Sequence, residues 1–222
     1  MKRHFCNFFT AALSVLYIIQ VLPILVSAFL SNNTSFILQE LVFLLPYCIG
    51  NFIIAMILIY SSFKRPVKTD ESIKSTVISF LGTNIYVIAT WFINFRNPNP
   101  NTSVLYLATI LQVFIQIFYL IALLNLGLSL TVLPEARELK TRGIYSISRH
   151  PLYSAYMLIN ILNIFVNQSL IYIPMMLLCN LLQYLRAKSE EKVLLEVFPE
   201  YENYKKNVMF IGKASWFRIK KK

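Results

Sequence analysis

The sequence predicts an all-α, multi-pass membrane protein with about six transmembrane segments. The 222 residues are 57% hydrophobic and only 14% charged, whereas soluble domains carry about 25% charged residues. The apolar residues form long runs, and a bilayer is crossed by roughly 20 of them. The net charge of +11 comes from Lys and Arg residues that lie between and after these runs. This placement predicts a lipid bilayer as the partner and no nucleic acid.

Four stretches in the first part of the chain are each long enough to span a bilayer. They are residues 5–30, 36–63, 77–95 and 104 to about 126. Two shorter apolar stretches follow, residues 152–165 and 170–185, and they predict a short, tight helical hairpin. We expect a cytosolic amphipathic helix after this hairpin. The first stretch follows Lys2 and Arg3, so a cleaved signal peptide is an alternative. Its length favours a transmembrane helix.

The positive-inside rule predicts the topology, because cytoplasmic loops collect Lys and Arg. With six crossings, all of the 21 Lys and Arg residues except Arg96 lie on one side. We therefore expect both termini in the cytosol, in either a bacterial inner membrane or the endoplasmic reticulum. The chain divides into N-terminal helices (1–126), a C-terminal region (127–208) and a basic tail (209–222).

Two long polar segments, residues 133–151 and 186–222, lie on the predicted cytosolic side. In the first, Gly143 permits a turn that places Tyr145 near the start of the hairpin. Pro151 suits the first turn of the next helix, which puts His150 and Tyr153 at the mouth of the hairpin. The alternative is a basic loop with interfacial aromatic residues, which many membrane proteins possess.

The second polar segment continues directly from the last apolar stretch. Arg186 and Glu190 stand at i and i+4, on one face of a helix, and Glu191 follows. Near the aromatic residues of the first segment, this cation and anion could bind a zwitterionic ligand. The alternative is an amphipathic surface helix. The three cysteines, Cys6, Cys48 and Cys179, have no CxxC spacing, so we expect buried thiols and no metal site.

The two segments share the pattern G-x-Y-x-x-x-R-H-P-x-Y, a hairpin, then E-E-x-x-L and Y-x-x-Y. The matching residues are Gly143, Tyr145, Arg149, His150, Pro151, Tyr153, Glu190, Glu191, Leu194, Tyr201 and Tyr204. This combination resembles the isoprenylcysteine carboxyl methyltransferase family and its phospholipid-methyltransferase relatives. The order and spacing of the pieces make the match specific.

The resemblance implies an enzyme that uses S-adenosylmethionine to methylate a lipid-like or prenylated acceptor in the membrane, favouring O-methylation of a carboxylate such as that of a prenylcysteine. It implies Arg186 as the residue that orients the acceptor. It implies cofactor contacts by Tyr145, His150, Pro151, Leu152, Tyr153, Glu190 and Glu191. A carboxylate is already ionised at neutral pH, so no general base is assigned.

Two other function classes stay open. Membrane sterol reductases that use NADPH resemble the same C-terminal architecture, but the continuation Pro151-Leu152-Tyr153 favours the methyltransferase. A channel, carrier or scaffold would be expected to carry charges along a central path, and Glu40 is the only charged residue deep in an apolar run. Gln112 and Gln116 could line an acceptor route, although hydrogen bonding between helices is the favoured role.

Overall fold

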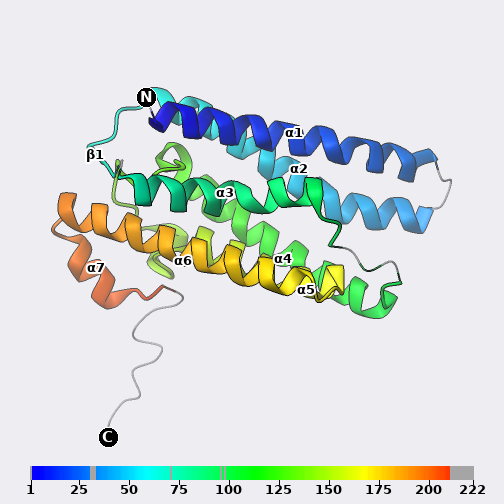
Figure 1. Cartoon of the computed structure of the whole chain (residues 1–222). Helices are drawn as coiled ribbons and strands as arrows, with labels where there is room; N and C mark the ends of the chain where they lie inside the picture. Colours follow the sequence, from blue (N-terminus) through cyan, green and yellow to red (C-terminus); the bar gives the residue numbers. More distant parts are fainter. Residues whose placement is uncertain (1, 31–33, 71, 96, 98, 211–222) are drawn as a thin grey trace, which may run out of the picture.

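The structure is a computed structural model that describes residues 2–30, 34–70, 72–95, 97 and 99–210. This part of the chain is mostly helical (Figure 1). Its seven α-helices are α1 (Lys2–Leu30), α2 (Thr34–Phe63), α3 (Ile73–Phe92), α4 (Thr102–Leu126), α5 (Pro151–Asn167), α6 (Tyr172–Val197) and α7 (Tyr201–Asn207). Two short strands, β1 (Lys68–Thr69) and β2 (Glu135–Ala136), and two 3-10 turns, η1 (Gly127–Ser129) and η2 (Gly143–Ser146), complete it.

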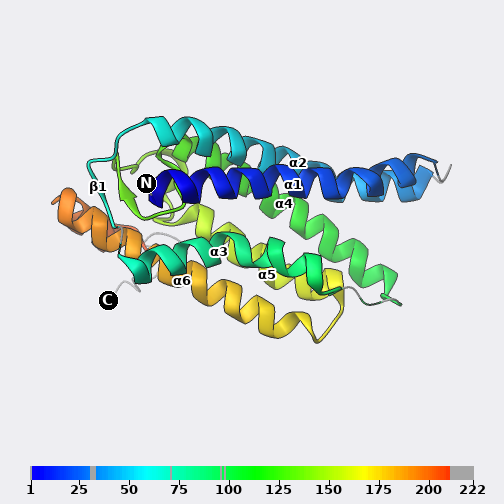
Figure 2. The ribbon, with the colours of Figure 1, turned by 45° about the horizontal axis from the view of Figure 1, so that its top comes forward.

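Helices α1 to α6 form an elongated bundle whose members run roughly along one long axis (Figures 1 and 2). The main contacts pair α1 with α2, α4 with α5, and α3 with α6. Large apolar side chains stay exposed on the outside of the bundle, among them Phe63, Phe92 and Leu170. Such a surface would be unfavourable in water and is typical of a protein that faces lipid.

Three helical segments within the described residues are long and apolar enough to cross a membrane. They are Lys2–Ser27, Ile73–Phe92 and Thr102–Ser129. The expectation of a helical, multi-pass membrane protein is thus supported, whereas six crossings with cytosolic termini stay a prediction. Arg96, the side chain of Glu40 and residues 211–222 lie outside the described part of the chain.

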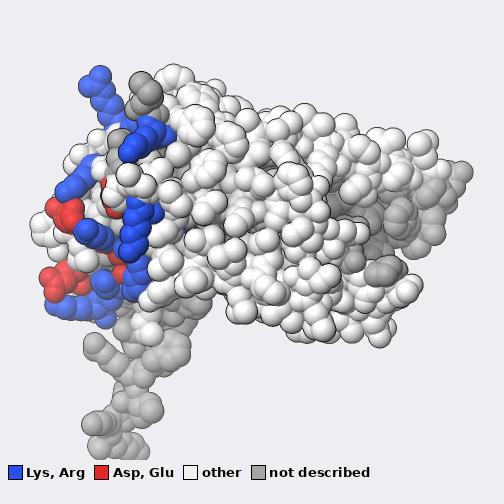
Figure 3. All heavy atoms as spheres, in the orientation of Figure 1, with Lys and Arg blue, Asp and Glu red and all other residues white. Residues whose placement is uncertain are grey.

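Charged side chains gather at one end of the molecule on the face drawn in Figure 3. This is the end where α1 begins and where β1 and α7 lie (Figure 1). The described residues over the rest of that face are uncharged where Figure 3 draws them in white. The distribution agrees with the sequence-based expectation that basic residues collect on one side of a membrane.

The predicted hairpin is present, but its second helix is longer than expected. The segment that carries Glu190 and Glu191 continues α6 without a break, so it is not a separate amphipathic helix. At about 1.5 Å per residue, the 26 residues of α6 extend about 39 Å. The reason is local: after Pro174, near the start of α6, the chain is rich in strong helix formers and meets no further proline until Pro199.

Hydrogen bonds to the residue before α4 fix the turn of this hairpin. Gln168 adopts a left-handed conformation, with φ at 48°, and closes α5. Its side-chain amide exchanges hydrogen bonds with the backbone of Asn101, at 2.7 and 2.9 Å. Of the cysteines, Cys6 and Cys179 are buried as predicted and Cys48 is half-buried, and all three are free thiols.

Candidate functional site

A cavity of about 200 Å³ begins at the charged end and continues between the helices. A single bound water needs roughly 10–15 Å³, so this space can hold a much larger ligand. Its charged end is lined by Glu135, Tyr145, Arg149, His150, Tyr153, Arg186 and Glu190. Its interior is lined by residues of α1 to α5 that include Thr10, Tyr17, Asn51, Asn84, Gln116, Tyr119 and Tyr156.

The loop before α5 holds its shape through backbone geometry that the sequence indicated. Gly143 has φ at +60°, a conformation that favours glycine, and a Cβ there would lie 2.5 Å from Oδ1 of the exposed Asn125 side chain, which would have to shift. Pro151 occupies the first turn of α5 and His150 precedes it. Tyr145 is buried, and its carbonyl accepts a hydrogen bond from the Tyr204 hydroxyl at 2.5 Å. Burial, followed by the charge of Glu190, raises the pKa of Tyr145, so its hydroxyl stays protonated.

Tyr153 connects the acidic and the basic residue of the site. Its hydroxyl donates a hydrogen bond to Glu190 Oε2 at 2.9 Å. The guanidinium carbon of Arg186 lies 5.3 Å from the centre of its ring, within the range of a cation–π interaction. Glu190 and Arg186, one turn apart on α6, therefore flank one aromatic side chain. The sequence-based expectation that these three residues meet agrees with this geometry.

Arg186 is buried among fixed partners. Its Nη1 donates to Gln183 Oε1 at 3.1 Å and its Nη2 to the carbonyl of Val132 at 3.3 Å. Its Nε has no hydrogen-bond partner within the described part of the chain. A methyl group at Gly82 of α3 would lie 2.7 Å from Arg186 Cδ. Helix α3 thus packs closely against the aliphatic part of the Arg186 side chain at Gly82. The sequence did not indicate this contact.

Glu191 points to a different set of partners from Glu190. Its Oε1 accepts a hydrogen bond from His150 Nε2 at 3.1 Å and pairs with Arg149 at 3.2 Å. Its Oε2 lies 2.9 Å from Lys205 and 3.5 Å from Lys188. Burial alone would raise its pKa, but the hydrogen bonds from His150 and Lys205 and the charge of Arg149 lower the pKa of Glu191 well below its usual range.

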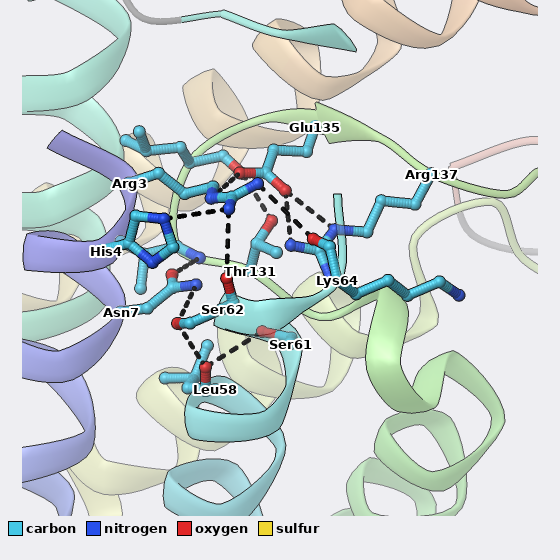
Figure 4. Close-up of polar contacts among 12 residues, drawn as sticks. Arg3, His4, Asn7, Leu58, Ser61, Ser62, Lys64, Thr131, Glu135 and Arg137 are labelled. Atoms are coloured by element: carbon cyan, nitrogen blue, oxygen red, sulfur yellow. Dashed lines mark hydrogen bonds and ion pairs between the residues drawn. The ribbon is translucent and has the colours of Figure 1, made fainter. Parts of the chain in front are cut away.

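A second ionic cluster joins the N-terminal helices to the loop that leads into the site, and we call it the anchor cluster (Figure 4). It consists of Arg3, Asn7, Ser62, Glu135 and Arg137. Arg137 forms a close ion pair with Glu135 at 2.8 Å, and Arg3 lies 3.8 Å from the same carboxylate. Arg3 also donates to the carbonyl of Ser62 at 3.1 Å. Asn7 accepts from the backbone N–H of Val132 at 3.1 Å.

The anchor cluster also fixes the path of the loop after α4. Strand β2 pairs with β1 in antiparallel register, with Thr69 opposite Glu135. The loop therefore carries Glu135 to the cavity wall and Val132 to Arg186. Sequence analysis missed Arg3, Glu135 and Arg137 as parts of the site region. The sequence does place a Glu and an Arg two positions apart just after an apolar helix. This pattern is too common to distinguish a residue of the site from an ordinary surface residue.

The predicted site residues divide into two groups. Tyr145, His150, Leu152, Tyr153, Arg186 and Glu190 line the cavity. Pro151 and Glu191 are not among the lining residues: Pro151 begins α5, and Glu191 holds the surrounding cations. Of the two glutamines on α4, Gln112 bonds across to Asn163 at 2.9 Å, which is the favoured expectation. Gln116 instead lines the cavity.

The groups at the charged end fit the charges of S-adenosylmethionine. An amino acid moiety needs an anion for its ammonium and a donor for its carboxylate. Glu190 could supply the anion. Arg149 lines the cavity and has a buried Nε without a hydrogen-bond partner among the described residues, so it could supply the donor. The rings of Tyr145, His150 and Tyr153 provide the aromatic walls that a planar base requires.

Comparison with known families agrees with the motif. Residues 107–196 match the model of the isoprenylcysteine carboxyl methyltransferase (ICMT) family. The matched part runs from α4 through the loop and α5 to the glutamate pair of α6. No match is found among curated proteins. The resemblance seen in the sequence is therefore confirmed, over a region that holds every predicted site residue.

Proposed function

We propose that this chain transfers a methyl group from S-adenosylmethionine to a lipid-like acceptor held in the membrane, and that the reacting group is a carboxylate, as in a prenylcysteine. The observation that best supports this proposal is a single cavity. It joins a charged end, which suits a polar cofactor, to an interior between apolar helices. The family match covers the residues at that charged end. A polar cofactor and a lipid can then meet at Tyr153.

The cofactor end is assigned to residues of the loop, α5 and α6. Glu190 accepts hydrogen bonds from the cofactor ammonium. The Tyr153 hydroxyl, which donates a hydrogen bond to Glu190 Oε2, holds this carboxylate in place. Tyr145, His150 and Leu152 enclose the remaining parts and exclude water. When bound, S-adenosylmethionine supplies the methyl group on a sulfonium centre. The residues that line the cavity would hold the cofactor and the acceptor next to each other, and positioning of this kind is a large part of rate enhancement.

Arg186 is assigned to the acceptor. A guanidinium can hold a carboxylate through two parallel hydrogen bonds, and its Nε is a donor that the described part of the chain leaves unused. A carboxylate has a reference pKa of about 4, so it is already the nucleophile at neutral pH. Positive charge on sulfur and negative charge on oxygen disappear together in the reaction, so a dry cavity does not oppose it.

Glu191 and Pro151 act by positioning. Glu191 ties the start of α5, through His150, to Arg149 and to Lys205 of α7. Its charge is satisfied by these neighbours, so we assign it the task of fixing the loop around the cofactor. Pro151 sets the first turn of α5, which aims Tyr153 at Glu190. Both residues therefore shape the cofactor end without lining the cavity.

The test is methyl transfer in membranes. Membranes that contain the protein are incubated with S-adenosylmethionine labelled in its methyl group, and the lipid extract is compared with that of membranes carrying Glu190→Gln. We expect label in a lipid fraction only with the unmodified protein. Mild alkali then releases volatile methanol from a carboxyl methyl ester, whereas a methylated amine keeps its label. Label that resists alkali would overturn the carboxylate assignment.

The other function classes give distinct results in companion assays. A sterol reductase consumes NADPH with a sterol substrate and does not bind labelled S-adenosylmethionine. A carrier or scaffold binds neither cofactor. Equilibrium binding of labelled S-adenosylmethionine to the purified protein therefore separates the classes, and absence of binding would remove the methyltransferase proposal altogether.

A further inference from the structure

Gln116 is a buried amide that faces the cavity and has no protein partner among the described residues. The residue is 4% exposed and lines the cavity. Neither its side-chain oxygen nor its nitrogen has a hydrogen-bond partner within that part of the chain. Gln112, one turn earlier on the same helix, donates to Asn163 and does not line the cavity. Two similar side chains on α4 thus differ in what they face.

The depth of Gln116 makes this unusual. It lies ten residues before Leu126, where α4 ends at the charged end of the cavity. At about 1.5 Å per residue this is about 15 Å along the helix, or roughly half of a hydrocarbon core about 30 Å thick. Polar groups at that depth are strongly disfavoured unless they find a hydrogen-bond partner. A partner supplied by something in the cavity would remove the penalty.

The cavity wall carries other polar side chains besides Gln116. Tyr17 of α1, Asn51 of α2 and Asn84 of α3 line it as well. Asn84 is already used, because its amide nitrogen bonds to Thr10 at 3.0 Å and to the carbonyl of Phe80 at 2.9 Å. In a mostly apolar pocket, a few polar side chains ordinarily fix the orientation of polar groups on the ligand. This lining suits a chain that carries a polar group.

We propose that the interior of the cavity recognises an acceptor lipid whose chain carries a hydroxyl or secondary amide at the position of Gln116, and that Gln116 is the residue that selects it. A glutamine amide both donates and accepts, and both of these capacities are unused in Gln116 within the described residues. The matching ligand group is one that also donates and accepts. The identity of this ligand as the acceptor rests on the proposed function, whereas the polar subsite itself does not.

The experiment compares two probes that differ in one group. Both are S-alkylated N-acetylcysteines with chains of equal length: one chain is plain hydrocarbon, and the other carries a hydroxyl at the mid-chain position. Their dissociation constants are measured with purified protein in lipid nanodiscs. We expect the hydroxylated probe to bind about 10-fold tighter, the effect of one satisfied hydrogen bond in a buried site. Outside the protein, the hydroxyl disfavours entry into lipid, so partitioning alone predicts the opposite order.

Matched variants assign the preference to one residue. Gln116→Leu should abolish it by weakening the hydroxylated probe alone, and Gln116→Asn, which keeps an amide, should retain part of it. Gln112→Leu on the same helix should leave the preference intact. Loss of preference in Gln112→Leu as well would assign the effect to the packing of α4 and overturn the proposal.

The unmodified protein provides a result even where a variant fails to fold. Equal or tighter binding of the hydrocarbon probe would show that water satisfies Gln116, and the proposal would be wrong. Methyl transfer to the two probes is measured separately. A binding preference without methyl transfer to either probe would leave the polar subsite standing while removing the proposed function, so the two failures are distinguishable.

Discussion

Gly82→Ala is expected to damage turnover although Gly82 lies on α3, outside the motif-bearing segments. The added methyl group would lie 2.7 Å from Arg186 Cδ and 3.3 Å from Leu182 Cβ. Carbon atoms prefer separations of about 3.5–4.0 Å, so the arginine stem must move by about 1 Å. The Cβ atom of Leu182 is attached directly to the backbone of α6 and can yield little. The guanidinium would move away from Gln183 and Val132, which now hold it.

The magnitude follows from this displacement. A shift of about 1 Å in a positioning group costs up to about 100-fold in rate. We expect kcat to fall about 10- to 100-fold, which corresponds to roughly 1.4–2.7 kcal/mol. The fold should survive, because overpacking costs about 1–3 kcal/mol and replacing a helical glycine by alanine returns about 0.5–1 kcal/mol. The dissociation constant for S-adenosylmethionine should not change.

The assay measures kcat and KM with methyl-labelled S-adenosylmethionine and a prenylcysteine acceptor, together with cofactor binding at equilibrium. Gly50→Ala is the control, because a methyl group there meets Leu120 at 3.7 Å and Tyr119 at 3.9 Å, which are ordinary contacts. Because Gly50 lines the cavity, the Gly50→Ala variant can have a changed KM for the acceptor, but its kcat should stay the same. Normal kcat in Gly82→Ala would refute the role of Arg186 as a precisely held acceptor residue.

Three further variants test the cofactor end and the anchor cluster. Glu190→Gln should weaken S-adenosylmethionine binding by about 10- to 150-fold, the cost of a charged hydrogen bond of about 1.5–3 kcal/mol, and unchanged affinity would remove Glu190 from the site. Glu191→Gln leaves the buried Arg149 without its ion pair, whereas Lys188 and Lys205 are partly exposed, and it should lower unfolding stability by about 3–5 kcal/mol. Because the pKa of Glu191 is lowered in the folded protein, its stabilisation is present above the unfolded pKa of about 4.3 and is lost as pH falls toward the folded value; acid unfolding that is identical with and without this carboxylate would contradict the assignment. Arg3→Ala breaks the contact of α1 with Glu135 and should lower thermal stability by about 1–3 kcal/mol, with a fluorescence melting curve as the measurement; an unchanged curve would show that the anchor cluster adds nothing.

The sequence predicted the parts of this protein that depend on local pattern. Apolar run length located α1 to α5 and the start of α6 to within a few residues, since a membrane leaves few other ways to satisfy the backbone. Fixed spacing predicted the approach of Tyr153 to Glu190, because the loop and the hairpin return the chain to the same end. The extension of α6 through Glu191 was missed, since charged helix formers after an apolar helix do not reveal whether the helix continues or breaks.

The sequence could not predict which polar residues line the cavity, because this depends on which side of each helix faces the cavity. Thr10, Asn51, Asn84 and Gln116 are single polar residues in apolar runs, and such residues ordinarily join helices to one another. Gln112 does so, and Gln116 lines the cavity instead. Gln112 and Gln116 are one turn apart on α4, in the same apolar run of the sequence. Which of them lines the cavity depends on how the other helices pack around α4.

The same packing explains why the matched family region cannot by itself determine the acceptor. Residues 107–196 supply the cofactor end, but α1, α2 and α3 contribute much of the interior wall and are tied to the site loop by Arg3 and Asn7. Cofactor chemistry is constrained by a few charged and aromatic residues in fixed positions. We expect acceptor choice to depend instead on the polar residues that line the cavity on helices without a motif, so that it can change while the proposed cofactor residues stay the same. Exchanging α1 to α3 with those of a related protein should therefore alter which lipid is methylated and leave the affinity for S-adenosylmethionine unchanged.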